Sequence, residues 1–142
     1  MAYLFGEYEH TMDEKGRVSL PSRFRKELPK TVVLAPGPNG QLNVFSQEGF
    51  ANWTKSLFER DGGYNVNSAK HTKERQFYNS SASTVDIDNA GRVSISPKLR
   101  KFAGLEKDVV VTGDEDHACI WDKDRWEAYI GDFDPSEIFS EE

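Results

Sequence analysis

The stretch Asp13-Glu-Lys-Gly-Arg-Val-Ser-Leu-Pro-Ser-Arg-Phe-Arg-Lys26 decides the fold, because it returns 75 residues later as Asp88-Asn-Ala-Gly-Arg-Val-Ser-Ile-Ser-Pro-Lys-Leu-Arg-Lys101. Seven of the fourteen aligned positions are identical, and three more exchange similar side chains. These exchanges are Leu20/Ile95, Arg23/Lys98 and Phe24/Leu99. A repeat of this length indicates two copies of one supersecondary unit, which commonly bury their apolar faces against each other.

Each copy contains a tight turn between two short strands. In the first copy, residues 7–12 and 17–20 alternate in polarity as strands do. The intervening turn begins with an aspartate, which can bond to the backbone ahead of it, and ends with a glycine, which tolerates a positive φ angle. We therefore predict that four residues structure the two turns: Asp13, Gly16, Asp88 and Gly91.

A short helix and a second hairpin follow each turn. In the first copy, a helix over 22–28 places Phe24 and Leu28 on its inner face, and strands over 31–35 and 41–46 flank a Pro-Gly turn. A helix with Phe50, Trp53 and Leu57 completes the copy. The second copy repeats this order as strands 83–87 and 92–95, a helix over 97–103, strands 108–113 and 118–122, and a helix with Trp126 and Tyr129.

The 142 residues divide into four expected segments, and the chain is long enough to bury a substantial core. Residues 1–60 form the first repeat and residues 61–80 a linker that leads into a connecting helix. Residues 81–131 form the second repeat. Residues 132–142 form an acidic tail that we expect to be mobile.

The charge is distributed unevenly along the chain. The net charge is −6, yet residues 13–30 carry six Lys or Arg against three acids, and residues 88–107 carry five against two. Residues 108–142 carry twelve acids against two bases. The repeats are therefore basic islands, a pattern that favours contact with an anionic partner, in an otherwise acidic chain.

Cysteine and histidine usage indicates neither a disulfide nor a metal site. Cys119 is the single cysteine and lies in an apolar run, so we interpret it as a core residue, with a catalytic thiol as the alternative. The histidines, His10, His71 and His117, have no metal-ligand spacing with one another or with Cys119. No secretory signal or run of 18 apolar residues is present, so we expect a cytoplasmic protein without a membrane partner.

The order Asp-x-x-Gly-Arg-Val-x-Leu/Ile, then a proline and a short basic helix, resembles the swapped-hairpin barrel of the AbrB class of transcription factors. Two such units, Asp13 to Arg17 and Asp88 to Arg92, resemble the MraZ family in particular, from about Tyr3 to Ile130. The resemblance implies an α+β fold in which two tandem AbrB-like β-hairpin/helix repeats form one intrachain pseudo-twofold swapped-hairpin β-barrel with flanking helices.

The same resemblance implies a bacterial DNA-binding regulator that is not an enzyme and needs no cofactor. Such proteins form rings of eight or more subunits, bind short direct repeats in double-stranded DNA upstream of the division and cell-wall operon, and repress that operon, their own. A cytoplasmic, nucleoid-associated location follows. Position by position, the DNA contacts fall on Lys15, Arg17 and Arg92. The second copy has Ala90 in place of Lys15, which makes it a weaker phosphate ligand.

The residue types suit this role on physical grounds. An arginine fork matches guanine O6 and N7 in the major groove, whereas Lys15 suits a phosphate. The alternative for Arg17 and Arg92 is a salt bridge with the aspartate four positions earlier, or plain solvation. The remaining basic residues either form solvated helix faces or contact phosphate or another subunit; they are Arg23, Arg25, Lys26, Lys98, Arg100 and Lys101.

Two other functional classes compete with a DNA-binding regulator. A small hydrolase would use Asp13 and Asp88 as paired carboxylates, but the turns already account for both residues. An oligomeric scaffold or antitoxin-like interaction module would bind a protein through the acidic tail. Its binding would be insensitive to Arg17 and Arg92 and would be lost on deletion of the residues after Asp132.

Overall fold

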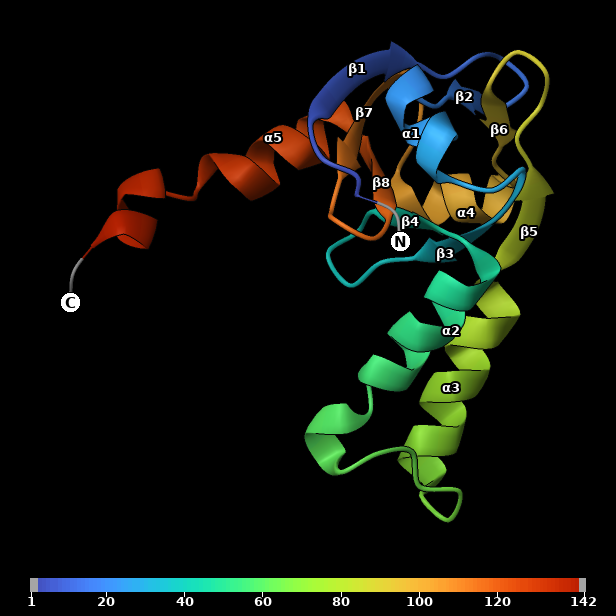
Figure 1. Ribbon diagram of the computed structural model, residues 1–142, viewed down its shortest axis with the longest axis vertical. Coiled ribbons are helices and arrows are strands. Elements are labelled where there is room, and N and C mark those ends of the chain that lie inside the picture. The colour runs from blue at the N-terminus through green and yellow to red at the C-terminus, as the bar shows by residue number, and fades with distance from the viewer. Residues whose placement is uncertain (1–2, 141–142) are drawn as a thin grey trace.

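The computed structural model describes residues 3–140 and contains two copies of one strand and helix order (Figure 1). The first copy consists of β1 (Glu7–Thr11), β2 (Arg17–Ser19), α1 (Ser22–Glu27), β3 (Thr31–Pro36), β4 (Leu42–Phe45) and α2 (Gln47–Ser56). The 3₁₀ helix η1 (Glu59–Asp61) and α3 (Ala69–Ser81) connect the copies. The second copy consists of β5 (Ser83–Asp86), β6 (Arg92–Ser94), α4 (Pro97–Ala103), β7 (Asp108–Gly113), β8 (Ala118–Asp122) and α5 (Lys123–Gly131), before a 3₁₀ helix η2 (Pro135–Phe139). These elements confirm the order expected from the repeat.

The strand pairing follows a pseudo-twofold axis. Six strands form one antiparallel sheet in the order β1-β7-β8-β4-β3-β5, and β2 and β6 form a separate antiparallel ribbon. Exchanging each strand with its counterpart in the other copy reverses the six-stranded order and leaves the ribbon unchanged. The axis therefore passes between β4 and β8 and between β2 and β6.

The first hairpin of each copy is exchanged between the copies. The first strand of copy one, β1, pairs with β7 of copy two, while β5 of copy two pairs with β3 of copy one. The strands that follow the two turns, β2 and β6, pair with each other. This exchange confirms the α+β class and the intrachain swapped-hairpin arrangement.

Both sheets enclose one hydrophobic core. Val18 of β2 and Val93 of β6 face each other and are fully buried, together with Leu34, Val44 and Val109 of the six-stranded sheet. The helices that follow the turns cover this core with two residues that the repeat aligns, Phe24 of α1 and Leu99 of α4. The rings of Phe24 and Tyr8 form a T-shaped pair with 5.4 Å between their centroids. Burial of each such side chain contributes about 1.5–3 kcal/mol. The shared core explains why the two copies form one unit.

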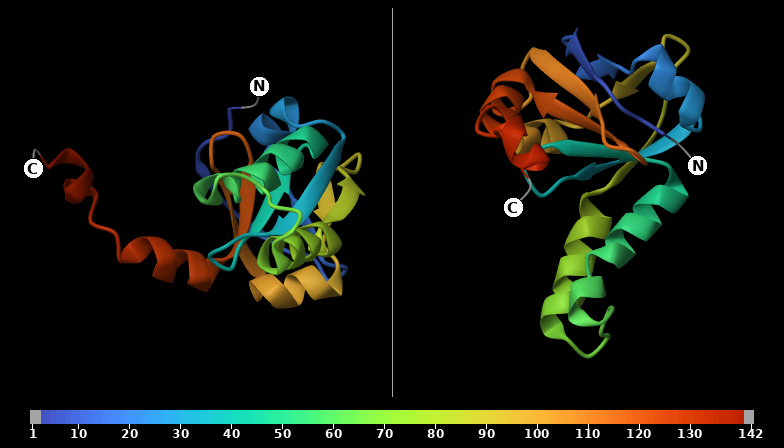
Figure 2. Two further views of the ribbon diagram at one scale, coloured as in Figure 1. Left: turned by 90° about the horizontal axis from the view of Figure 1, so that it is seen from below. Right: turned by 60° about the vertical axis from the view of Figure 1, so that its left-hand side comes forward.

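The last helix of the first copy and the segment that connects the copies form a helical hairpin that extends away from the sheets (Figures 1 and 2). It consists of α2, η1 and α3, which pack through Trp53 and Tyr78 at 5.5 Å between ring centroids. At its far end, His71 is buried against Phe58 and its Nε2 lies 3.0 Å from Oδ2 of Asp61. The expected linker therefore contains an ordered turn as well as the expected helix.

The C-terminal helix α5 begins on the sheet and leads away from it (Figure 2). Trp126 and Tyr129 pack against Trp121 of β8 at 5.3 and 4.8 Å between ring centroids. Residues 132–140 are exposed, and their mobility stays a prediction. Residues 1–2 of the expected first repeat and 141–142 of the expected tail lie outside the described residues. Within residues 3–140, no helix combines the length and apolar character needed to cross a bilayer.

Candidate nucleic-acid interface

The first turn is organised by the side chain of Asp13. Its Oδ1 accepts the backbone N–H groups of Lys15 at 3.0 Å and Arg17 at 2.8 Å. Its Oδ2 accepts the Nε–H of the Arg17 guanidinium at 2.6 Å. Gly16 closes the turn with a φ of +78°, a conformation that L side chains rarely adopt. The aspartate therefore fixes both the turn and the arginine behind it.

The second turn has the same geometry. Oδ1 of Asp88 accepts the backbone N–H groups of Ala90 at 2.9 Å and Arg92 at 2.8 Å, and Oδ2 accepts the Arg92 Nε–H at 3.0 Å. Gly91 has a φ of +80°. In both turns, hydrogen bonds from the arginine four positions later, first from its backbone N–H, hold the pKa of the aspartate below its usual value. Both carboxyl groups are therefore ionised at neutral pH.

The β2–β6 ribbon joins the two turns into one surface, which we call the two-turn surface and define as residues 13–19 and 88–94. Val18 and Val93 face the core, so Arg17 and Arg92 lie on the outer side of the ribbon. Two backbone hydrogen bonds of 2.9 Å tie each turn to the opposite copy. The N–H of Leu20 donates to the Gly91 carbonyl, and the N–H of Ile95 donates to the Gly16 carbonyl. The two turns are thus one rigid feature.

The two arginines keep part of their donor capacity. Their side chains are about one third exposed, with values of 29% for Arg17 and 32% for Arg92. Both use Nε to contact their own aspartate, and Nη1 of Arg92 also lies 3.8 Å from Oδ2 of Asp13 across the ribbon. The salt bridges weighed in the sequence analysis are therefore present. Since they engage the Nε edge, the Nη nitrogens of Arg17 can still meet another acceptor.

Two helix arginines contact the turns of the opposite copy. A Cβ atom added to Gly16 would lie 2.8 Å from Cζ of Arg100, and one added to Gly91 would collide with the guanidinium of Arg25. The sequence analysis grouped these two arginines with the other helix cations and did not predict this contact. The sequence did contain a sign that these two arginines share a role, because Arg25 and Arg100 occupy one of the seven identical positions of the repeat.

The remaining predicted cations surround the two-turn surface less closely. Lys15 is exposed in the first turn, whereas the second turn carries the neutral Ala90 at this position. The guanidinium of Arg23 lies over the Phe5 ring at 5.7 Å from its centroid. The exposed lysines of α1 and α4 are Lys26, Lys98 and Lys101. Their contacts with phosphate or another subunit stay predictions.

The two carboxylates do not have the environment of a hydrolase site. Both are occupied by backbone and guanidinium donors, which stabilise the ionised form and leave the group a poor proton acceptor. Cys119 is a buried residue, as expected, beside Val110 and Trp121. Burial, with a smaller contribution from the Asp114 charge, raises the pKa of its thiol to about 12, so the free protein holds no thiolate nucleophile there.

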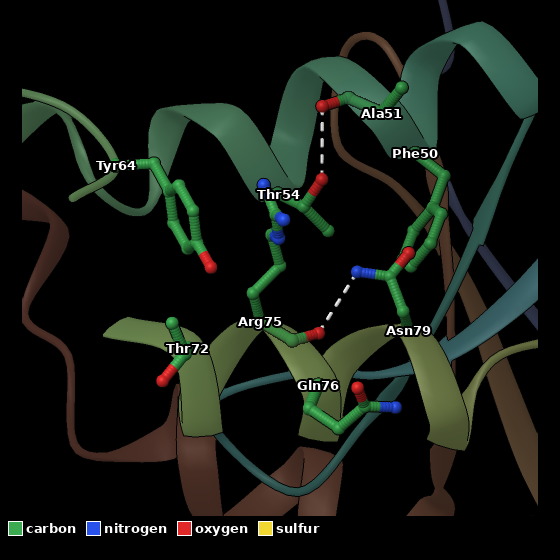
Figure 3. Close-up of a pocket in the computed structure, with 8 residues that line it drawn as sticks. All are labelled: Phe50, Ala51, Thr54, Tyr64, Thr72, Arg75, Gln76 and Asn79. Carbon is green, nitrogen blue, oxygen red and sulfur yellow. Dashed lines mark hydrogen bonds between the residues drawn. The ribbon is translucent and has the colours of Figure 1, made fainter. Parts of the chain in front are cut away.

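A separate groove of about 550 Å³ lies between α2 and α3 (Figure 3). Two of its polar groups are bound within their own helices: Thr54 donates to the Ala51 carbonyl at 3.0 Å, and the Asn79 amide donates to the Arg75 carbonyl at 2.9 Å. The Arg75 guanidinium covers the Tyr64 ring at 3.7 Å. The groove belongs to the helical hairpin and contributes no residue to the two-turn surface.

Comparison with known proteins identifies relatives over nearly the whole chain. The family model described as "MraZ protein, putative antitoxin-like" matches residues 3–62 and 79–141. The chain is 37% identical to a protein of Acetivibrio thermocellus, over 90% of this chain and 87% of the relative. It is 39% identical to a protein of Leifsonia xyli, over 88% and 85%, and 39% identical to one of Deinococcus radiodurans, over 89% and 86%. All three relatives are named transcriptional regulator MraZ.

Proposed function

The chain belongs to the MraZ family of transcriptional regulators, and we propose that it binds double-stranded DNA through the two-turn surface. The observation that carries this proposal is the β2–β6 ribbon, on which two partly exposed arginines are held by aspartates at equivalent positions. The names of the relatives support the regulatory role, and the ribbon geometry supports the mode of contact.

A two-stranded ribbon such as β2–β6 is a kind of element that can read the major groove of DNA. The major groove admits a two-stranded β-ribbon, and an arginine there can bind guanine O6 and N7. Because Arg17 pairs with Ser94 and Arg92 with Ser19, the two arginines are diagonal neighbours, about 7–8 Å apart between Cα atoms. We propose that each arginine contacts a base edge while its aspartate keeps the guanidinium in place. Such a fixed fork loses little conformational entropy on binding.

The phosphate contacts come from the cations beside the ribbon. Lys15, Arg25 and Arg100 lie in or against the two turns, where they would meet the backbone on either side of the groove. Phosphate contacts position a protein on DNA and make its affinity salt-dependent, whereas base contacts specify sequence. This division explains how a protein with a net charge of −6 can bind DNA: the positive charge is local.

We further propose that the protein acts as a ring of eight or more subunits that represses its own division and cell-wall operon. A ribbon with two base-reading arginines gives limited discrimination, since each bidentate pair contributes about 1–3 kcal/mol. Simultaneous binding of several ribbons to direct repeats multiplies this affinity without new contacts. Such a regulator would act in the cytoplasm, in association with the nucleoid.

Fluorescence anisotropy with DNA from upstream of the protein's own gene tests the proposal. Arg17→Ala and Arg92→Ala should each weaken binding by about 1–3 kcal/mol and relax selectivity at one base. The matched control is Arg60→Ala/Lys70→Ala, which also removes two exposed cations but on the helical hairpin. If the Arg17→Ala/Arg92→Ala protein binds this DNA as tightly as the control does, the two-turn surface is not the interface.

The antitoxin-like description of the family favours one alternative, a protein-interaction module. Its candidate surface is the exposed acidic segment 132–140. Deletion of the residues after Asp132 separates the two functions. If the protein binds DNA through the two-turn surface, the truncated protein should keep its full affinity for the operator DNA. If it is an interaction module, the Arg17→Ala/Arg92→Ala protein should bind its protein partner unchanged, and the truncated protein should not bind it.

A further inference from the structure

The loop between β7 and β8 brings together three side chains with different metal-binding atoms. Asp114 offers a carboxylate oxygen, His117 an imidazole nitrogen and Cys119 a sulfur, and all three ligand atoms lie within 4.8 Å of one another. The chain spacing of these residues matches no common zinc motif. The β-hairpin assembles them because His117, directly before β8, and Cys119, within it, lie two residues apart in extended chain and therefore point to the same side.

We propose that Asp114, His117 and Cys119 form a zinc-binding site. Oxygen, nitrogen and sulfur ligands together suit Zn²⁺, which accepts all three types in tetrahedral sites. Bond lengths of about 2.0–2.3 Å require ligand atoms about 3.3–3.8 Å apart in such a site. Nε2 of His117 already lies 3.5 Å from Oδ2 of Asp114. The Asp114 side chain is 69% exposed, so it can move to complete the geometry.

The histidine is held as metal-binding histidines are held. Its Nδ1 lies 2.7 Å from Oδ1 of Asp116. In the tautomer that carries the proton on Nδ1, this N–H donates to the carboxylate and Nε2 directs its lone pair toward Asp114, 3.5 Å away. A carboxylate behind the imidazole fixes the ring and strengthens it as a ligand. The ring is also fixed by packing against Phe45 at 4.7 Å between centroids. The site is therefore preorganised on its histidine side.

An entry path to the buried sulfur exists. Asp114 and Cys119 both line a cavity of about 240 Å³ between the outer face of the sheet and α5, with Gln41 and Thr112 beside them. In the free protein the thiol donates to Oδ1 of Asn43 at 3.4 Å. Metal binding breaks the S–H bond and forms a Zn–S bond, and one proton leaves to solvent. The exposed carboxylate side leaves the fourth position open to water.

The proposed site is independent of DNA recognition. The strand β7 runs from Asp108, which pairs with Thr11 before the first turn, to Gly113 beside the site, about 17 Å of extended chain. Bound zinc would join the β7–β8 loop to the sheet face under α5. Its expected effect is stabilisation of the folded protein, which rises with the logarithm of the metal concentration above Kd.

Cobalt titration of the full chain tests this proposal, because Cys119 is the only cysteine and a thiolate-to-cobalt charge-transfer band reports on it alone. We expect one cobalt ion per chain, the charge-transfer band, visible bands of a four-coordinate ion and displacement by Zn²⁺. Asp116→Asn should keep the band and weaken affinity about 10–100-fold. The matched control, Glu115→Gln, removes a charge from the same loop and should bind as the parent does.

Cys119→Ser should lose the band, with circular dichroism as the check that it folds; His117→Asn provides the same test if the serine variant does not fold. A titration in which the folded parent protein shows no thiolate band would overturn the proposal. So would binding that Asp116→Asn and Glu115→Gln weaken equally, because that result indicates a diffuse acidic loop rather than an oriented histidine.

Discussion

Replacement of Gly91 by alanine tests two features of the second turn: the positive φ angle of its backbone and the close contact of Gly91 with Arg25. Gly91 has a φ of +80°, and a Cβ in this left-handed region costs about 1–2 kcal/mol. The added Cβ would also lie 2.8 Å from Cδ of Arg25 and closer still to its guanidinium. Since Arg25 is exposed and flexible, it can move away. We expect the free energy of unfolding to fall by about 1–2 kcal/mol, through the backbone strain alone.

Gly62 provides the matched control. Its φ is +85°, and within the part of the chain that the structure describes no heavy atom beyond Gly62 and its two chain neighbours lies within 4 Å of an added Cβ. Urea denaturation should therefore show similar losses for Gly62→Ala and Gly91→Ala. DNA affinity should separate them: Gly91→Ala displaces a cation from the two-turn surface and should lower the salt slope by about 1, whereas Gly62→Ala should not.

A double-mutant cycle shows whether the loss acts through Arg25. In an Arg25→Ala background, Gly91→Ala should cost no further DNA affinity, because the displaced cation is already absent. The two substitutions together should thus bind DNA as Arg25→Ala alone does. An equal loss of DNA affinity from Gly91→Ala in both backgrounds would refute the assignment of Arg25 to the interface.

Three further predictions concern the core, the carboxylates and the charge of the turns. Phe24→Ala, which empties a fully buried position, should lower the free energy of unfolding by about 3–5 kcal/mol in urea denaturation. The pKa values of Asp13 and Asp88 are lower in the folded protein than the usual aspartate value of 3.8. Their contribution to stability is therefore complete above pH 3.8 and is lost as the pH falls through the lower folded-state pKa values. Thermal denaturation should accordingly show no effect of these two groups between pH 6 and 8. Ala90→Lys, which gives the second turn the charge that Lys15 gives the first, should raise DNA affinity and steepen its salt dependence by about one unit in an anisotropy titration.

The repeat made the fold predictable. Each copy has a turn that begins with Asp and ends with Gly-Arg, followed by a helix and a hairpin. The strand and helix ranges given from the sequence end within one residue of those in the structure. The exchange of β1 and β5 between the copies came from the family resemblance, because alternation in a strand such as residues 7–11 shows which side is buried but not which strand is its partner. Pairing is a tertiary property.

The candidate site was predictable within each turn and not between turns. The Asp13 and Asp88 bonds follow from turn chemistry, which acts over four residues. The contacts of Arg25 with Gly91 and of Arg100 with Gly16 join residues more than sixty positions apart, so no local pattern reports them. The cluster of Asp114, His117 and Cys119 was missed for a different reason. These residues are close in sequence, but their spacing matches no common zinc motif, and only the conformation of the β7–β8 hairpin brings their ligand atoms together.

The pseudo-twofold axis bears on the kind of DNA site that the protein can recognise. A ribbon that is symmetric in its arginines presents the same face in both directions along DNA and would by itself suit an inverted repeat. Direct repeats have a direction, so their recognition requires a difference between the copies. That difference lies beside the arginines, where the first turn carries Lys15 and the second turn carries the neutral Ala90 at the equivalent position. The exposed cation would bind one phosphate strand more strongly than the other. The two turns have the same backbone geometry and differ in the charge of one side chain. We infer that this difference in charge gives each subunit its orientation on the DNA.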